Sequence, residues 1–196
     1  MLNKIVLVED NPLLRMDVYD ILKDYNYEIV GQANDGLEAI EVCKKYSPDL
    51  VIMDIDMPVL DGIKASKIIR KENLAKGILL LTSYEDKEHI QMAKEVGAYG
   101  YLVKPATENI LIPAVEMCLN KIEEFEKMKK DLDKVTSKLT DRKLVDRAKG
   151  ILIREFDISE NEAYSRIRNL SMDKRTTLGE IAKLIIIGYD KWLKVL

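Results

Sequence analysis

Five short apolar runs with the composition of strands alternate with helical patterns through the first 110 residues. The runs are Ile5–Val8, Ile29–Gly31, Leu50–Met53, Ile78–Thr82 and Tyr101–Val103. The segments between them carry apolar residues at three- and four-residue spacing and are Leu13–Tyr25, Leu37–Lys45, Ile63–Lys71 and Glu88–Val96. This alternation predicts a doubly wound α/β fold, a five-stranded parallel sheet covered by helices on both faces. Ligands of such sheets bind at the carboxyl ends of the strands.

From Leu111 onwards the pattern changes to a seven-residue repeat. One position of the repeat is occupied by Leu111, Cys118, Phe125, Leu132 and Leu139, and the accompanying position by Val115, Ile122, Lys129 and Thr136. The repeat predicts a long helix over residues 112–139 that pairs with a second copy as a coiled coil. The residues predicted to form the dimer contact are Val115, Cys118, Ile122, Phe125 and Leu132. The alternative is that Leu111–Leu119 is the last helix of the α/β domain and the remainder a solvated helix.

Three shorter helices are predicted after Leu139. The first covers roughly Arg142–Glu155, and Ser159 begins a Ser-Glu-Asn-Glu capping box that starts the second. Thr176 and Thr177 can cap the third. Residues 140–196 are therefore expected to form a small all-helical module, separate from the α/β domain over residues 1–120.

Composition limits the classes of protein to which this chain can belong. Apolar residues make up 47% and charged residues 33% of the chain, a balance typical of globular proteins. No apolar run approaches the roughly 18 residues of a membrane span, and the first residues do not resemble a signal peptide, so a cytoplasmic protein without a membrane partner is expected. Residues 1–111 carry a net charge of −6, whereas residues 139–196 carry +3. A polyanionic partner is therefore expected to meet the C-terminal module.

Acidic residues follow two runs that are expected to be neighbouring strands. Glu9 and Asp10 follow the first run and Asp54 follows the third. Carboxylates that are brought together repel one another unless a cation lies among them, and an all-oxygen site favours Mg²⁺. A carboxylate beside Mg²⁺ is a competent nucleophile toward a phosphoryl donor, and Lys104 and Thr82 are placed to contact the transferred group. The alternative is that acidic strand ends simply solvate their loops.

Four separated motifs make residues 1–120 resemble a response-regulator receiver domain. They are Glu9-Asp10, Asp54-Ile-Asp-Met-Pro with Asp61-Gly62 after it, Thr82-Ser83, and Tyr101-Leu-Val-Lys104-Pro105. The resemblance implies a flavodoxin-like fold in which a histidine kinase phosphorylates Asp54. It also implies a Mg²⁺ site made by Glu9, Asp10, Asp54 and the backbone carbonyl of Asp56. The chain would then be a phosphoacceptor and not an enzyme.

The same resemblance implies a switch that responds to phosphorylation. Thr82 and Lys104 would contact the phosphoryl group, and Tyr101 would swing inward when Thr82 moves. Pro105 would follow a cis peptide bond.

The C-terminal module resembles the ANTAR domain of antitermination response regulators. The resemblance rests on Arg142, Ala148-Lys149-Gly150-Ile-Leu, Ser159, Glu162-Ala163-Tyr164, Ile167-Arg168, Ser171-Met172, Leu178 and Ile181-Ala182. It implies a dimer that forms on phosphorylation and binds RNA with tandem stem-loops, which prevents a terminator hairpin from forming. Among such regulators the ethanolamine-utilisation type is the expected branch. The alternatives are a DNA-binding transcription factor, although no helix-turn-helix pattern is present, or a module that binds only protein.

Candidate RNA contacts in the module are basic or aromatic: Lys149, Arg168, Arg142, Tyr164, Lys174 and Arg175. Cationic side chains can contact phosphates, and tyrosine or arginine planes can stack on unpaired loop bases. The alternative for each basic residue is a solvated surface charge, and for Tyr164 a core position. Gly150 lies inside a predicted helix, where glycine costs about 1 kcal/mol relative to alanine. Either close helix packing or close approach of RNA would explain it.

Overall fold

The structure is a computed structural model that describes residues 3–83 and 87–193. The chain divides into two compact units, Met1–Glu126 and Lys127–Leu196. The first unit has two hydrophobic cores, one on each face of its sheet, and the second unit has one. No helix of the described residues is both long enough and apolar enough to cross a membrane.

The first unit is built on a five-stranded sheet in which every pair of neighbouring strands is parallel. The strands are β1 (Lys4–Val8), β2 (Glu28–Ala33), β3 (Leu50–Asp54), β4 (Gly77–Thr82) and β5 (Gly100–Val103), in the spatial order β2-β1-β3-β4-β5. The predicted doubly wound α/β fold is confirmed. The strand order reverses between β1 and β3, so the carboxyl ends of these two strands flank the crevice where ligands of such sheets bind.

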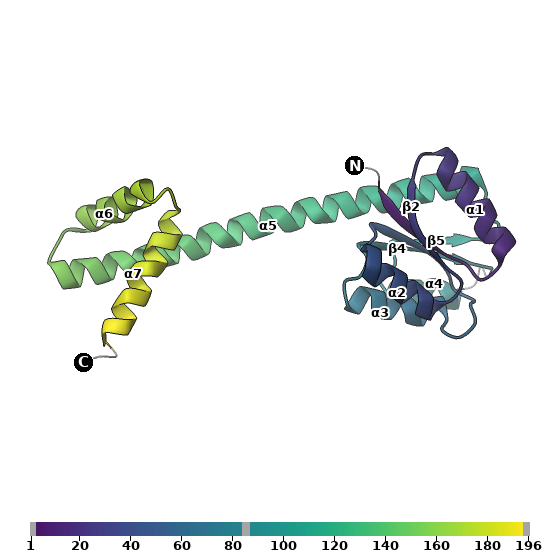
Figure 1. Cartoon of the computed structure of the whole chain (residues 1–196), viewed down its shortest axis with the longest axis horizontal. Coiled ribbons are helices and arrows are strands. Elements are labelled where there is room, and N and C mark those ends of the chain that lie inside the picture. The colour runs from purple at the N-terminus through teal and green to yellow at the C-terminus, as the bar shows by residue number, and fades with distance from the viewer. Residues whose placement is uncertain (1–2, 84–86, 194–196) are drawn as a thin grey trace. The chain divides into compact units, whose positions relative to one another are not determined.

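Helices cover both faces of the sheet (Figure 1). One face packs against α2 (Gly36–Tyr46), α3 (Gly62–Lys71) and α4 (Lys87–Glu95), and the other against α1 (Pro12–Asp24) and the first turns of α5 (Glu108–Phe156). Each strand supplies both cores because successive side chains point to opposite faces. In β1, for example, Val6 and Val8 belong to the first core, and Ile5 and Leu7 to the second.

Helix α5 continues through the predicted break between Leu139 and Arg142 and ends at Phe156. The prediction of a separate helix over Arg142–Glu155 is therefore wrong. Neither glycine nor proline lies in this stretch, and the Thr140 hydroxyl donates a hydrogen bond to the Thr136 carbonyl at 3.0 Å within the same helix. Nothing in the local chemistry ends the helix there.

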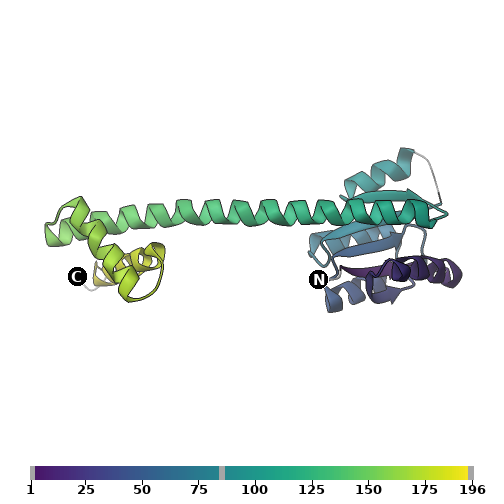
Figure 2. The same ribbon diagram turned by 90° about the horizontal axis from the view of Figure 1, so that it is seen from above.

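The second unit packs two short helices against the last turns of α5 (Figure 2). These are α6 (Glu160–Asp173) and α7 (Leu178–Leu193), which give the predicted all-helical module. Both predicted caps are present: the Ser159 hydroxyl accepts a hydrogen bond from the Glu162 amide at 3.3 Å, and the Thr177 hydroxyl accepts one from the Glu180 amide at 3.1 Å. The core comprises Val145, Ala148, Ile151, Ile167, Ile181, Ala182 and Ile186.

Three residues predicted to form a dimer contact are instead part of the α/β core. Val115, Cys118 and Ile122 are at most 6% exposed and pack with α1 and the sheet. The prediction is wrong for these three, because the first turns of α5 serve as the last covering helix of the sheet. The alternative interpretation of Leu111–Leu119 is thus correct for this part of the repeat.

Beyond this point the apolar stripe of α5 is exposed. Phe125 and Leu132, the other two predicted contact residues, are 56% and 66% exposed. The exposed stripe comprises Phe125, Met128, Leu132, Val135 and Leu139, which we call the α5 stripe. Its spacing alternates between three and four residues, as in a coiled-coil seam. In this part of α5 the second apolar position of the seven-residue repeat is therefore occupied by Met128 and Val135. The prediction that Lys129 and Thr136 occupy it is wrong.

Candidate functional site

Three carboxylates meet at the carboxyl ends of β1 and β3. Glu9 follows β1, Asp10 is its neighbour, and Asp54 is the last residue of β3; one oxygen from each lies within 4.8 Å of the others. Glu9 and Asp54 are almost completely buried, at 1% and 2% exposed, whereas Asp10 is exposed. The strand order thus brings together the acids that the sequence placed after two different strands.

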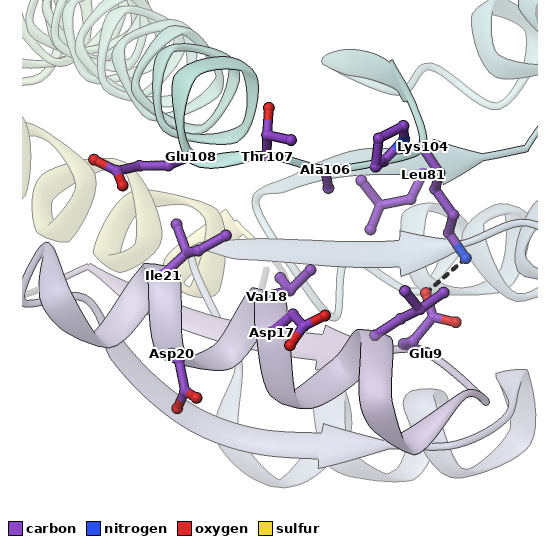
Figure 3. A pocket seen from close by; sticks show the side chains of 12 residues that line it. Glu9, Asp17, Val18, Asp20, Ile21, Leu81, Lys104, Ala106, Thr107 and Glu108 are labelled. Carbon is purple, nitrogen blue, oxygen red and sulfur yellow. Dashed lines mark ion pairs between the residues drawn. The ribbon is translucent and has the colours of Figure 1, made fainter.

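One lysine lies between the two buried carboxylates. Lys104 Nζ is 2.7 Å from Glu9 Oε2 and 2.9 Å from Asp54 Oδ2. Figure 3 shows the lysine side chain extending from the end of β5 toward Glu9. The Lys104–Pro105 peptide bond is cis, as the resemblance to receivers implied.

Burial sets the protonation behaviour of this cluster. Burial raises the pKa of Asp54 and of Glu9, and the hydrogen bonds from Lys104 oppose this rise without cancelling it. Burial disfavours the charge on Lys104 as well, but the hydrogen bonds to Glu9 and Asp54 outweigh it and raise the pKa of the ammonium group. Lys104 pairs with two of the three acids, and its one positive charge does not balance their three negative charges, so the cluster can accept a further cation.

The donor set fits a magnesium ion. Asp54 Oδ1 is buried and has no hydrogen-bond partner among the described residues, although a buried polar atom ordinarily has one. Carboxylate oxygens are the ligands that Mg²⁺ prefers, and Glu9, Asp10 and Asp54 supply three. The side chain of Asp56 is exposed, so any role of this residue as a ligand depends on its backbone carbonyl.

Two residues that the sequence analysis did not single out shape the loop after β1. Asn11 caps α1: its side chain accepts hydrogen bonds from the Leu13 and Leu14 amides, and its own amide donates to Glu9 Oε1 at 3.3 Å. Arg15 Nη1 donates to the Glu9 carbonyl at 2.6 Å. The Asn11-Pro12 pair was the available signal, because asparagine favours the cap position and proline the first helical position.

The Asp61-Gly62 motif has a steric and a capping role next to Asp54. A Cβ at Gly62 would lie 2.0 Å from the Asp54 carbonyl oxygen, so any side chain there would displace the backbone of Asp54. Asp61 caps α3 by accepting a hydrogen bond from the Lys64 amide at 2.8 Å. Together they hold α3 against the end of β3.

The remaining predicted switch residues lie at the ends of β4 and β5. Thr82 is fully buried, and its carbonyl accepts a hydrogen bond from the Lys104 amide at 2.7 Å. Tyr101 is partly buried and packs against the core that α4 covers. Contact of Thr82 with a phosphoryl group and movement of Tyr101 stay predictions.

A pocket of about 490 Å³ opens beside Lys104 on the α1 side of the sheet (Figure 3). Residues of α1, including Asp17, Val18 and Ile21, form one wall, and Ala106 and Glu108 lie opposite. The pocket reaches Glu9 and Lys104, and Asp54 is not among the residues that line it.

The structure brings together three of the six predicted RNA contacts in the second unit. Arg142, Lys149 and Tyr164 line a pocket of about 510 Å³ between the end of α5, α6 and the start of α7. Arg168, Lys174 and Arg175 are exposed but do not line it. Tyr164 is also exposed, so the alternative of a core position for it is not observed.

Ion pairs already hold Lys149 in place. Its Nζ lies 2.8 Å from Asp146 Oδ1 on α5 and 2.7 Å from Glu160 Oε1 at the start of α6. Its side chain is only 17% exposed, so the pairs are partly shielded from solvent. In this arrangement Lys149 ties α6 to α5, and a phosphate contact would compete with these pairs.

Comparison with known proteins assigns both units to families. Residues 5–116 match the response regulator receiver domain, and residues 133–186 match the ANTAR domain. The chain belongs to the response regulators and carries an ANTAR domain. This receiver–ANTAR order is the one that the two sequence resemblances implied.

Relatives cover the receiver alone or nearly the whole chain. The transcriptional regulatory protein PdtaR of Mycobacterium tuberculosis is 38% identical over 183 residues, which span 93% of this chain and 89% of PdtaR. The chemotaxis protein CheY of Bacillus subtilis is 35% identical over 120 residues, or 61% of this chain and all of CheY. The structure of Vibrio cholerae CheY4 superimposes with a TM-score of 0.57 at 34% identity and covers 61% of this chain and 100% of its own.

Proposed function

We propose that this response regulator is phosphorylated on Asp54 and that the phosphoryl group controls RNA binding by its ANTAR domain. The observation that carries the proposal is the buried Asp54 carboxylate, which one lysine and two further acids surround at the switch point of the sheet. A histidine kinase is the expected donor, because receiver domains accept phosphoryl groups from such partners. The chain itself is proposed to be a phosphoacceptor and not an enzyme.

The chemistry follows from the positions of the side chains. An Asp54 oxygen forms a bond to phosphorus while the bond between phosphorus and the donor's histidine nitrogen breaks, which leaves an acyl phosphate on Asp54. Lys104 then turns from the carboxylates toward a phosphoryl oxygen, and the Thr82 hydroxyl contacts another. Glu9, Asp10, Asp54 and the Asp56 carbonyl would hold Mg²⁺, which would neutralise charge on the phosphoryl group.

We further propose that phosphorylation favours a dimer joined through the α5 stripe. Five large apolar side chains at coiled-coil spacing are exposed on this helix, and pairing with the same stripe of a second copy would remove them from water. The two ANTAR domains of the dimer would then bind tandem RNA stem-loops. Binding would prevent a terminator hairpin from forming and allow transcription to continue.

RNA is favoured over DNA as the ligand of the module. ANTAR domains act as RNA-binding outputs, and PdtaR, whose match spans this domain too, is named a transcriptional regulator. The connections between its described helices, residues 157–159 and 174–177, lack the glycine that often forms the tight turn of a helix-turn-helix. The module would recognise an RNA stem-loop by contacts with the unpaired bases of its loop, since the deep major groove of A-form RNA excludes side chains.

A competition experiment tests the choice of nucleic acid. An RNA stem-loop is first selected by the phosphorylated full chain from a pool of hairpins with randomised loops. Its complex with the protein is then challenged with excess duplex DNA in a gel shift. We expect the RNA complex to survive, because the contacts involve loop bases that a duplex lacks. Loss of the shifted band to duplex DNA, or failure to select any hairpin, would contradict the proposal.

A further inference from the structure

Gly150 lies on the side of α5 that faces away from the core of the ANTAR unit, and the structure of this unit does not require a glycine at this position. A Cβ at Gly150 would meet nothing within 4 Å, so close helix packing does not explain the residue. The backbone there is helical, so no left-handed conformation requires glycine either. Glycine destabilises a helix interior relative to alanine. A ligand that approaches this face from outside would explain the residue.

Three basic residues surround Gly150 on the same face. Lys143 and Arg147 lie seven and three residues before it and Arg154 four after it, a spacing that places all of them on one side of a helix. All three are exposed. Arg154 Nε donates a hydrogen bond to the Gly150 carbonyl at 3.3 Å, so this side chain folds back along the helix toward the glycine.

The acid on this stretch already has a cationic partner. Asp146 is the one acidic residue between Lys143 and Arg154, and its carboxylate pairs with Lys149 at 2.8 Å. The ion pair lowers the pKa of Asp146 through the hydrogen bond from Lys149, so the acid stays charged and compensated. Lys149 also pairs with Glu160 at 2.7 Å, so these ion-paired groups together carry one excess negative charge. Lys143, Arg147 and Arg154 carry three positive charges, so the net charge of the face is positive.

We propose that the RNA backbone lies against this face of α5, with a phosphate close to Gly150 and with Lys143, Arg147 and Arg154 around it. The inference rests on the proposed RNA-binding function and assigns its surface. An absent side chain lets the sugar–phosphate backbone approach the helix more closely, and the flanking cations neutralise the phosphates. This surface differs from the residues that the sequence favoured, because Lys149 here compensates Asp146 instead of contacting RNA.

The first test uses two glycines in the same structural setting. Gly150→Ala in the full chain is expected to raise the melting temperature of the ANTAR unit, since alanine favours the helix, and yet to weaken binding of the selected stem-loop by about tenfold or more. Gly188→Ala is the matched control, because Gly188 also lies in a helix and also has nothing within 4 Å of a Cβ. It should stabilise the unit without changing RNA affinity. Unchanged affinity in Gly150→Ala would overturn the proposal.

The second test separates this surface from the one that the sequence favoured. Lys143→Ala combined with Arg154→Ala should flatten the dependence of log affinity on log salt by about 0.7–0.9 for each phosphate that the variant no longer neutralises. Lys174→Ala combined with Arg175→Ala removes the same charge elsewhere on the module and should leave the slope unchanged. If the second pair lowers the slope and the first does not, the RNA lies on another face and only this inference fails. If the parent binds no RNA, the proposed function itself fails.

Discussion

Asp54→Asn is expected to abolish phosphoryl transfer to this protein completely. Asparagine keeps the size of the side chain but lacks the anionic oxygen that attacks phosphorus, so no acyl phosphate can form. The parent chain, incubated with Mg²⁺ and a small phosphodonor, should gain one phosphoryl group by intact-mass spectrometry, and hydroxylamine should release it. Removal of Mg²⁺ by a chelator should stop the reaction as well, because the cluster would lose the cation that neutralises its charge.

The control for this experiment is a neighbouring acid. Asp56→Asn changes an exposed carboxylate in the same loop and leaves its backbone carbonyl in place, so labelling should persist. Glu9→Gln combined with Asp10→Asn removes two of the three side-chain carboxylates and should abolish labelling while Asp54 is intact. Hydroxylamine-sensitive labelling that survives in Asp54→Asn would show that the acceptor is another residue.

Leu132→Glu is expected to remove the phosphorylation-dependent dimer. Leu132 lies in the middle of the α5 stripe and is 66% exposed in the single chain, so a charge there disrupts pairing without disturbing the hydrophobic cores of the two units. Sedimentation of the phosphorylated variant should give the mass of one chain, whereas the phosphorylated parent should approach the mass of two chains. Affinity for RNA with two stem-loops should fall by about 10²–10⁴-fold, since the second contact is no longer linked to the first.

A matched substitution on the same helix distinguishes the effect of disrupting the α5 stripe from the effect of adding a negative charge. Ser137→Glu introduces the same charge about 140° around the helix from Leu132, away from the stripe. It should leave both the dimer and the affinity for tandem stem-loops unchanged. Labelling of Asp54 should be normal in both variants. A Leu132→Glu protein that dimerises as the parent does would place the pairing surface elsewhere in the chain.

The sequence was most informative where residue chemistry and strand order coincide. Glu9 and Asp54 could be placed at neighbouring strand ends because parallel strands bring their carboxyl ends to one edge. The lysine that lies between them could be anticipated from its position before Pro105. The hydrogen bonds of Asn11 and Arg15 to Glu9 could not, because they depend on how one loop folds.

The sequence was least informative where the same residue pattern is compatible with two different packing arrangements. A seven-residue apolar repeat describes a helix against a sheet as well as a helix against its copy, so Val115, Cys118 and Ile122 were assigned to the wrong surface. The break predicted after Leu139 is absent because Thr140 is accommodated inside the helix, where its hydroxyl donates a hydrogen bond to the Thr136 carbonyl of the preceding turn. For Gly150, the sequence left two explanations open, and the empty space around its missing side chain removes close helix packing.

A phosphoryl group on Asp54 is proposed to control RNA binding by a domain that does not contain Asp54. The most direct test of this control is the affinity of the full chain for a selected RNA with two stem-loops, measured by fluorescence anisotropy with and without phosphodonor in the presence of Mg²⁺. We predict that phosphodonor strengthens binding by the parent at least tenfold and leaves Asp54→Asn unchanged at the weaker affinity. Equal affinities for the phosphorylated and unphosphorylated parent, or a response to phosphodonor in Asp54→Asn, would contradict the account.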